Sequence, residues 1–384
     1  MGKRPLGIYV HIPFCVRKCA YCDFVSFPLN ASSPDSLTYI DAVISEIRGY
    51  KEKYRCEDTE YEVKTVYIGG GTPSVLAPSY IVRILACIRE NFMVDDGAEI
   101  TIEVNPGTVD EEKLRTYRTA GINRLSIGLQ SANDNELKEL GRIHDFADFM
   151  STYTWAVKAG FDNISVDIMT AIPLQTPESL KNTLDVVTGL IPAPEHISAY
   201  SLILEEGTPF YEKYAGCDSL PCADEMYHLT VDHLREKGYE RYEISNFSKE
   251  GYSSRHNTAY WKRRDYIGFG LAASSLVNGI RYKNTTVLAD YSGAPLGREL
   301  FEEEIKLSRE DEMSEFMFLG LRMSEGVRES DFERKFQVTI RDVYGTETER
   351  LVKEGLLIYD KDTGRYYLSD TGVDYGNYVF SRFV

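Results

Sequence analysis

Three cysteines, Cys15, Cys19 and Cys22, are the residues of this sequence with the clearest capacity for chemistry. They lie within eight residues, in the spacing C-x3-C-x2-C, directly after an apolar run over residues 6–12 that predicts a β-strand. Three thiols on so short a loop cannot all pair as disulfides, because one is left over. Cysteines on short loops are ligands of soft metal centres, including iron–sulfur clusters. The stretch therefore predicts a metal or cluster site at the end of an early strand.

The number of local ligands favours a cluster over a zinc ion. A structural zinc site usually takes four protein ligands, and only three cysteines are supplied here. His11 is the nearest candidate for a fourth ligand, but it lies inside the predicted strand. A cluster held by three cysteines leaves one iron open to an outside ligand. We therefore expect an iron–sulfur cluster rather than zinc or three incidental core cysteines.

Composition narrows the class of protein and its partners. The 384 residues are 43% apolar and 27% charged, as in an ordinary soluble globular protein. With 60 acidic against 43 basic residues, the net charge of -17 disfavours nucleic acid as a partner. No apolar run reaches the ~18 residues of a membrane span, and the N-terminus is not a convincing signal peptide. We expect a cytoplasmic, reducing location, in which the scattered cysteines are reduced structural thiols: Cys56, Cys87, Cys217 and Cys222.

The first 238 residues alternate six times between β-rich runs and helical patterns, which predicts parallel βαβ units. The predicted strands cover residues 6–12, 65–68, 99–104, 124–128, 163–168 and 196–201. Glycine and polar residues gather where these strands end: residues 15–22, 69–72, Glu103, Gln130, Asp167 and Tyr200. In a barrel the strand ends form one face, whereas a flat sheet would spread them along an edge. We therefore predict a partial (β/α)6 TIM-type barrel of the α/β class.

The pattern changes after residue 238. Residues 239–297 are rich in short, aromatic segments, and we expect a loop-rich cover over the barrel followed by a linker. Residues 298–384 predict three helices and a hairpin around Asp362-Thr363-Gly364, which resembles a small winged-helix-like α+β domain. Residues 301–384 carry 19 acidic against 12 basic residues. This charge favours a protein-interaction or capping role over DNA binding.

The spacing C-x3-C-x2-C is the signature of the radical S-adenosylmethionine (SAM) superfamily, which this chain resembles over residues 15–22. The resemblance implies a 4Fe-4S cluster whose open iron is chelated by SAM. The run Gly69–Pro73 looks like the superfamily's glycine-rich motif, because consecutive glycines let a ligand approach the backbone closely. Glu103 and Asp167 are lone acids in apolar strands, where a carboxylate is costly unless it is paired. The resemblance implies SAM contacts at Tyr9, Gly70, Gly71, Thr72, Glu103, Gln130, Arg142 and Asp167.

A closer resemblance covers nearly the whole chain. Residues 9–15, 69–73, 123–131, 140–144 and 242–247 resemble the coproporphyrinogen III dehydrogenase-like branch, and within it the HemW-type haem chaperones. The resemblance implies that the chain binds haem as cargo and transfers it to an acceptor haemoprotein. It implies no nucleic-acid partner, and any peripheral membrane association would come through the acceptor. The alternative is an oxygen-independent coproporphyrinogen III dehydrogenase, a SAM-dependent oxidative decarboxylase of porphyrin biosynthesis.

Two features favour the chaperone over the decarboxylase. The enzymes have a fourth cysteine two residues after the third, where this chain has Phe24, and a longer segment before the cluster than the 14 residues found here. Residues 256–261 form the H-N-x-x-Y-W motif typical of the chaperones. Imidazole is a natural axial ligand of haem iron, so His256 is a candidate haem ligand, the alternative being a hydrogen-bonded histidine that organises a loop. The chaperones often carry a second histidine beyond this motif, and residues 270–275 contain none.

Overall fold

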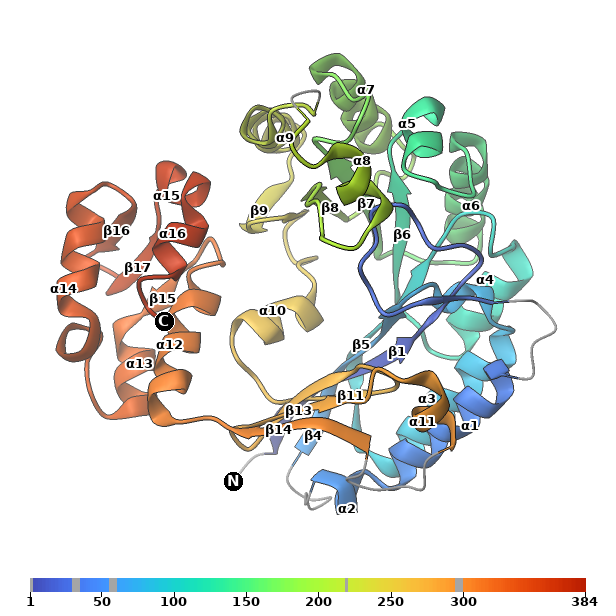
Figure 1. The fold of residues 1–384 in the computed structure, drawn as a ribbon, viewed down its shortest axis with the longest axis horizontal. Coiled ribbons are helices and arrows are strands. Elements are labelled where there is room, and N and C mark those ends of the chain that lie inside the picture. Colours follow the sequence, from blue (N-terminus) through green and yellow to red (C-terminus); the bar gives the residue numbers. More distant parts are fainter. Residues whose placement is uncertain (1–2, 30–34, 55–60, 218–219, 294–299) are drawn as a thin grey trace.

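A computed structural model describes residues 3–29, 35–54, 61–217, 220–293 and 300–384. Six parallel strands lie side by side in chain order and form a curved sheet, with helices packed on its outer surface (Figure 1). These strands are β1 (Arg4–Ile12), β4 (Tyr61–Gly70), β5 (Val94–Val104), β6 (Arg124–Gln130), β7 (Ile164–Thr170) and β8 (His196–Ser201). The predicted partial barrel is confirmed. Cys56 lies outside the described residues.

The helices that connect these strands follow the sequence patterns closely. The outer layer contains α1 (Asp35–Arg48), α3 (Pro78–Asn91), α4 (Glu111–Thr119), α5 (Asp134–Glu139), α6 (Phe146–Lys158), α7 (Pro177–Thr188) and α9 (Ala223–Glu236). Several begin at side chains that cap the first turn, as Asp145 and Thr176 do with reciprocal capping boxes. The shorter elements are β2 (Phe14–Cys15), β3 (Phe27–Pro28), α2 (Tyr50–Tyr54), η1 (Pro73–Val75) and α8 (Pro209–Tyr214). Gly49 separates α1 from α2.

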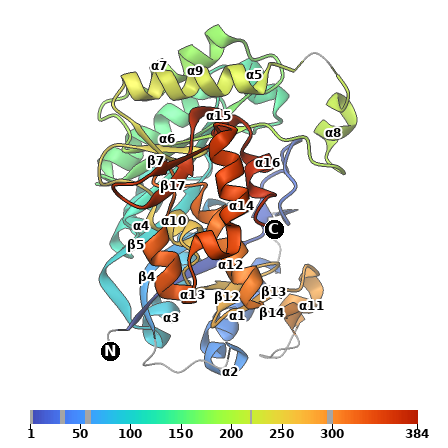
Figure 2. The same cartoon turned by 90° about the vertical axis from the view of Figure 1, so that its left-hand side faces the viewer.

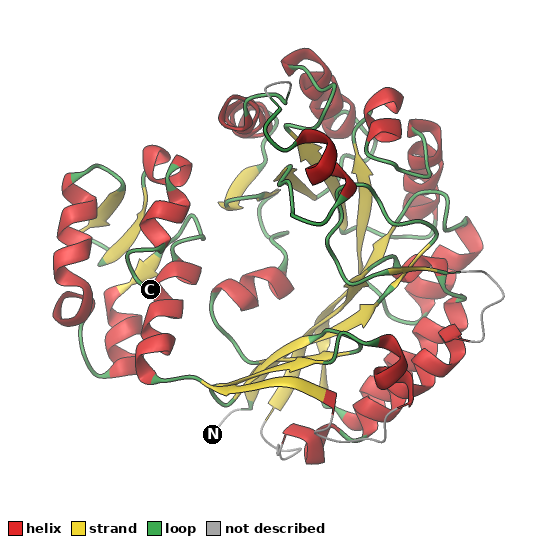
Figure 3. Cartoon of the chain, viewed as in Figure 1, coloured by secondary structure: helices red, strands yellow, loops and turns green. Residues whose placement is uncertain are grey.

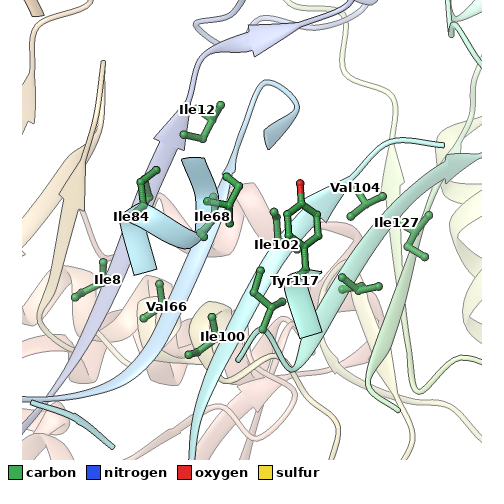
Figure 4. Packing of buried hydrophobic residues seen from close by; sticks show 14 of the residues in the cluster. Ile8, Ile12, Val66, Ile68, Ile84, Ile100, Ile102, Val104, Tyr117 and Ile127 are labelled. Carbon is green, nitrogen blue, oxygen red and sulfur yellow. The ribbon is translucent and has the colours of Figure 1, made fainter. Parts of the chain in front are cut away.

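Strands β1, β4, β5 and β6 are mostly buried because both faces of the barrel sheet are covered. Every residue of β6 except the last is buried. Ile8, Val66, Ile100 and Ile127 come from four adjacent strands and pack in one continuous core (Figure 4). β-Branched residues suit such a pleated, fully buried surface, and parallel sheets require it. The core therefore fixes the six strands in register, and with them the positions of their carboxyl ends.

Residues 239–297 contain more regular structure than the loop-rich cover we predicted. β9 (Glu240–Glu243) and β10 (Asn246–Ser248) extend the sheet beyond β8, and α10 (Arg255–Trp261) follows. At the opposite edge, β11 (Tyr266–Phe269) pairs with β1 and begins a run with β12 (Ser274–Val277) and β13 (Ile280–Asn284). α11 (Leu288–Gly293) follows, and β14 (Phe301–Lys306) pairs with β13. These strands have three to six residues, which is too short for a clear alternation of apolar and polar residues.

The C-terminal residues form a smaller unit with its own core (Figure 2). It comprises α12 (Arg309–Gly320), β15 (Val327–Arg328), α13 (Glu329–Phe336), α14 (Ile340–Lys353), β16 (Leu357–Asp360), β17 (Arg365–Leu368), α15 (Asp370–Asp374) and α16 (Gly376–Phe380). The three predicted helices and the hairpin are present, and the strand order β15-β17-β16 gives the winged-helix-like arrangement. Figure 3 shows that this unit is mainly helical beside the strand-rich barrel. Among the described helices, none is long and apolar enough to cross a membrane.

A buried ion pair joins the first helices to the added strands. Glu46 of α1 pairs with Lys53 of α2, and both side chains are nearly inaccessible to solvent. Glu46 also accepts hydrogen bonds from the backbone amide of Gly270 at 2.9 Å, from the Asn284 amide at 2.8 Å and from the Tyr291 hydroxyl at 2.5 Å. The Glu46 carboxylate thus joins α1 to residues that lie more than 200 positions later in the sequence.

Lys53→Met should be strongly destabilising, because it leaves the Glu46 carboxylate buried without its cation. We expect a loss of about 3–5 kcal/mol in the free energy of unfolding, measured by urea denaturation. The matched control is Arg115→Met, which breaks the exposed pair with Glu111 on α4 and should cost about 0–1 kcal/mol. Equal effects of the two substitutions would contradict a structural role for the buried pair.

Candidate functional site

A cavity of about 350 Å³ lies at the carboxyl ends of the barrel strands, and we call it the cluster cavity. It receives side chains or backbone from the ends of β4, β5, β6, β7 and β8 and from the loop after β1. Ten of the residues predicted to bind the cluster or SAM line it: Cys15, Cys19, Cys22, Gly70, Gly71, Thr72, Glu103, Gln130, Arg142 and Asp167. The barrel therefore brings together residues that span about 150 positions of the sequence.

The cysteine loop is closed at its base by a short parallel pairing of β2 with β3. The Phe27 amide donates to the Pro13 carbonyl at 2.7 Å, and the Leu29 amide donates to the Cys15 carbonyl at 2.8 Å. Cys15 is buried, whereas Cys19 and Cys22 are partly exposed. The backbone thus fixes where the loop leaves and rejoins the sheet, so its three thiols face the cavity.

Two polar side chains approach the thiols. The Thr72 hydroxyl donates to Cys15 Sγ at 3.5 Å, and Arg142 Nη1 donates to Cys19 Sγ at 3.4 Å. Burial is the largest influence on Cys15 and Cys22 and raises the pKa of both thiols. Each thiol therefore holds its proton until a metal takes the proton's place, so binding of a metal centre releases protons.

The donor set and its surroundings fit a group larger than a single ion. Among the described residues, no three His, Cys, Asp or Glu side chains form a site for one metal ion. The three thiols instead border a cavity large enough for a polynuclear group. The glycine run borders it closely: a Cβ on Gly71 would lie 2.8 Å from the Phe14 carbonyl oxygen and 3.0 Å from Cys15 Sγ. Gly70 has a φ of +112°, a conformation that favours glycine.

Two buried carboxyl groups also line the cluster cavity. Glu103 accepts hydrogen bonds from the Tyr67 hydroxyl at 2.9 Å and from the Gly70 amide at 3.1 Å. Burial, reinforced by nearby Asp167, raises the pKa of Glu103 to about 7. Asp167 accepts from the Ser126 hydroxyl at 2.8 Å, and burial also raises its pKa. Glu103 can therefore exchange a proton or attract a cation near neutral pH.

Arg142 connects the cysteine loop to the carboxyl end of β5 and to β6. Its guanidinium donates to Cys19 Sγ, to the Asn105 side chain and to the Gly128 carbonyl at 3.1 Å. The fixed fork of donors on arginine suits such bridging. Asn105 in turn donates to the Thr72 hydroxyl at 2.8 Å, so the arginine, the amide and the threonine form a chain that reaches Cys15.

Arg124 is a residue of the cavity that the sequence reasoning missed. It begins β6, is only 2% exposed and lines the cluster cavity. Its Nε atom has no hydrogen-bond partner among the described residues. The same signal that singled out Glu103 and Asp167, a lone charge in an apolar strand, was available for Arg124. Its positive charge lowers the pKa of Asp167 and so opposes the effect of burial on that carboxyl group.

Tyr9 and His256 were predicted to bind SAM and haem, and neither lines the cluster cavity. Tyr9 borders a neighbouring cavity, with its hydroxyl 2.9 Å from His11 Nδ1. Both ring nitrogens of His256 are engaged, Nδ1 with the Thr65 hydroxyl and Nε2 with the Tyr260 hydroxyl, each at 2.8 Å. Burial lowers the pKa of His256 to about 3, so the ring is neutral. Two of the other cysteines, Cys217 and Cys222, are exposed, and Cys87 is buried.

Comparisons with known proteins identify relatives of this chain. A family model for the Radical SAM superfamily matches residues 9–187, which include the cysteine loop and most cavity strands. The HemN C-terminal domain matches residues 307–374. A protein named Heme chaperone HemW from Lactococcus lactis is 36% identical over 100% of this chain and 98% of its own length. Its namesakes from Bacillus subtilis and Escherichia coli are 33% and 32% identical, over 98% and 92% of this chain and the same shares of their own.

The chain belongs to the heme chaperone HemW family within the radical SAM superfamily. Among solved structures, coproporphyrinogen III oxidase HemN from Escherichia coli shares the fold, with a TM-score of 0.82 over 99% of this chain and 90% of that protein. Its sequence identity to this chain is 24%.

Glu103→Gln should remove a pH dependence of stability. The folded chain retains the Glu103 proton up to a pKa of about 7, whereas the unfolded chain releases it near the usual 4.5. This stabilisation is complete below pH 4.5 and is lost as the pH rises through 7. Relative to the parent protein, the variant should therefore gain about 2–3 kcal/mol more at pH 8 than at pH 5.

Urea denaturation of both proteins without added SAM measures this difference. The matched control is Glu112→Gln on the exposed side of α4, where the difference between variant and parent should not change with pH. The same result for Glu103→Gln would show that its carboxyl group is already ionised in the folded chain at pH 5.

Proposed function

We propose that the chain binds haem and passes it to an acceptor haemoprotein, on a scaffold that carries a 4Fe-4S cluster and SAM. The observation that carries the proposal is the full-length likeness to proteins named Heme chaperone HemW. The cluster cavity supports the cofactor part, because three thiols, a close glycine backbone and two buried acids border one space. A cytoplasmic, reducing location suits these thiols.

Cys15, Cys19 and Cys22 would hold the cluster, and Gly70, Gly71, Thr72, Glu103, Gln130, Arg142 and Asp167 would hold SAM beside it. When bound, such a cluster supplies an electron to SAM. Tyr9 lines the adjoining cavity, and its ring stacks on the ring of Tyr67, which lines the cluster cavity.

The cavity residues would position SAM by charge and hydrogen bonding. Glu103 offers a carboxylate to the cationic amino group, and binding of that cation favours its charged form. The Gly70 amide and Tyr67 hydroxyl hold this carboxylate in place. Asp167, held by Ser126, suits the hydroxyl groups of a ribose. Arg142, beside Cys19, suits the SAM carboxylate.

The alternative function, oxidative decarboxylation of coproporphyrinogen III, draws support from the fold shared with HemN. Residue 24 separates the two functions, since the decarboxylating enzymes resembled by this chain have cysteine at that position. Phe24 is 61% exposed and lines the cluster cavity, so an apolar ring stands where a further thiol would be. This difference favours the chaperone function.

A pair of assays separates these functions. Titration of the purified protein with haem should give a stoichiometric shift of the Soret band. Anaerobic incubation with coproporphyrinogen III, SAM and a reductant should give no protoporphyrinogen IX, with HemN as the positive control. Multiple turnovers would refute the chaperone proposal in favour of the decarboxylase.

Replacing Cys15, Cys19 and Cys22 together by alanine should remove the cluster. After anaerobic reconstitution, the parent protein should hold ~4 irons and ~4 sulfides per chain and the triple variant almost none. Cys222→Ala, at an exposed thiol outside the cavity, is the matched control and should keep the parent's iron content. Iron retained by the triple variant would show that the cluster is held elsewhere.

We propose that His256 acts on haem through Tyr260 rather than by bonding to iron, because both of its ring nitrogens already have partners. His256→Ala should therefore preserve the shape of the haem spectrum and weaken haem binding by about threefold to tenfold. Tyr260→Phe, which removes only the hydroxyl that His256 contacts, should behave similarly. A Soret band displaced in His256→Ala but unchanged in Tyr260→Phe would identify His256 as an axial ligand.

A further inference from the structure

A second cavity of about 650 Å³ adjoins the cluster cavity, and we call it the aromatic cavity. Five aromatic residues line it, Tyr9, Phe24, Tyr260, Trp261 and Tyr266, together with charged residues of both signs: Asp23, Arg263, Arg281, Lys283 and Glu315. The rings of Tyr260 and Tyr266 contact each other edge to face, with centroids 4.6 Å apart. Flat aromatic faces and this volume are typical of a pocket for a large, planar, apolar ligand.

A third cavity of about 510 Å³ lies between the end of α10 and the C-terminal unit, and we call it the cationic cavity. Lysine and arginine outnumber aspartate and glutamate among its lining residues by seven to two, in a chain whose net charge is -17. Lys262 and Arg365 share Glu325 as a partner, and Arg334 pairs with Asp331. In the described part of the chain, no carboxylate lies within ion-pair distance of Arg264, Arg328 or Lys335.

The aromatic and cationic cavities share a wall, because Trp261 and Arg263 line both of them. Arg263 pairs with Glu315 at 2.6 Å through Nε and with Glu312 at 3.5 Å through Nη1, whereas its Nη2 atom is buried without a partner among the described residues. The Trp261 indole nitrogen is likewise buried and unpaired within the described chain. Both donors therefore belong to residues of the wall that the two cavities share.

We propose that the aromatic and cationic cavities together form the haem site, with the macrocycle in the aromatic cavity and the two propionates directed towards the cationic cavity. The proposal rests on the proposed function and assigns it a location. Haem is an apolar plane with two carboxylates at one edge, which matches an aromatic pocket bordered by unpaired cations. Arg263 and the Trp261 indole, at the shared wall, are placed to donate to the carboxylates.

The cluster cavity is a poorer site for the same ligand. Its volume of about 350 Å³ is smaller, and Glu103 and Asp167 would repel the propionates whenever they are ionised. The aromatic cavity nevertheless touches it, because Phe24 lines both. Haem in the proposed site would therefore rest against the loop that carries the three cysteines. His256, beneath Tyr260, becomes a positioning residue for one wall of the site.

The macrocycle half of the proposal is tested by filling the aromatic cavity. Thr286 lines this cavity, and its neighbour Val287 is exposed and does not. Thr286→Trp should weaken haem binding by about tenfold or more, since the indole would occupy space needed by the macrocycle. Val287→Trp, the matched control, should bind haem like the parent protein. Affinities are measured by Soret titration, with iron content confirming that each variant still holds its cluster.

The propionate half is tested by reversing charge. Lys335→Glu combined with Arg264→Glu should weaken haem binding by about tenfold, because both residues lie on the exposed rim of the cationic cavity. Arg341→Glu, on an exposed residue of the same C-terminal unit outside the cavity, is the matched control and should have no effect. Haem dimethyl ester, which lacks both carboxylates, should bind the parent protein more weakly than haem does. The double variant should bind the ester at least as tightly as the parent protein binds the ester.

The outcomes separate this proposal from the proposed function. If the parent protein binds no haem, the proposed function fails. If the parent binds haem but Thr286→Trp and the charge-reversal variant both bind it equally well, haem binds elsewhere and the site assignment is overturned. Equal affinity of the parent for haem and its dimethyl ester would overturn the propionate assignment.

Discussion

The contact between the end of β4 and the cysteine loop is the constraint on which the candidate site depends. The Gly71 amide donates to the Ile12 carbonyl at 2.8 Å, and the Thr72 amide donates to the Phe14 carbonyl at 2.7 Å. These bonds continue the parallel pairing of β1 with β4 beyond the sheet. A side chain at Gly71 would strike the loop backbone, so the approach is open only to glycine. The register of two core strands thereby sets the distance between the thiols and the buried acids.

Acidic and basic side chains are concentrated in different cavities of the molecule, although the chain as a whole is acidic. Buried carboxyl groups collect at the strand ends, where Glu103 and Asp167 face the cysteine loop. Unpaired cations collect on the other side of α10, against the C-terminal unit. The net charge of -17 argues against nucleic acid, yet it does not describe either cavity. Local surroundings, rather than composition, decide which ligand each space can accept.

The sequence was informative where its pattern was strong. Six apolar strands with polar residues at their ends predicted the barrel, and the spacing of Cys15, Cys19 and Cys22 placed three thiols on one loop. The strands after residue 239 were missed because a run of three to six residues shows little periodicity. β15, with two residues, was missed for the same reason. The aromatic and cationic cavities could not be foreseen, since their walls come from segments that meet only after α10 and the C-terminal unit pack together.

Helix α10 is fastened to the barrel at its first turn, where Glu99 of β5 accepts hydrogen bonds from the backbone amides of Arg255 and His256, each at 3.1 Å. The opposite wall of the cationic cavity belongs to α12, α13 and the strands of the C-terminal unit. A ligand in the cationic cavity would contact the barrel and the C-terminal unit at the same time and so hold the two together. By mass action, docking of the C-terminal unit on the barrel and binding of the ligand would then strengthen each other. A protein that moved the C-terminal unit away from the barrel would also weaken ligand binding.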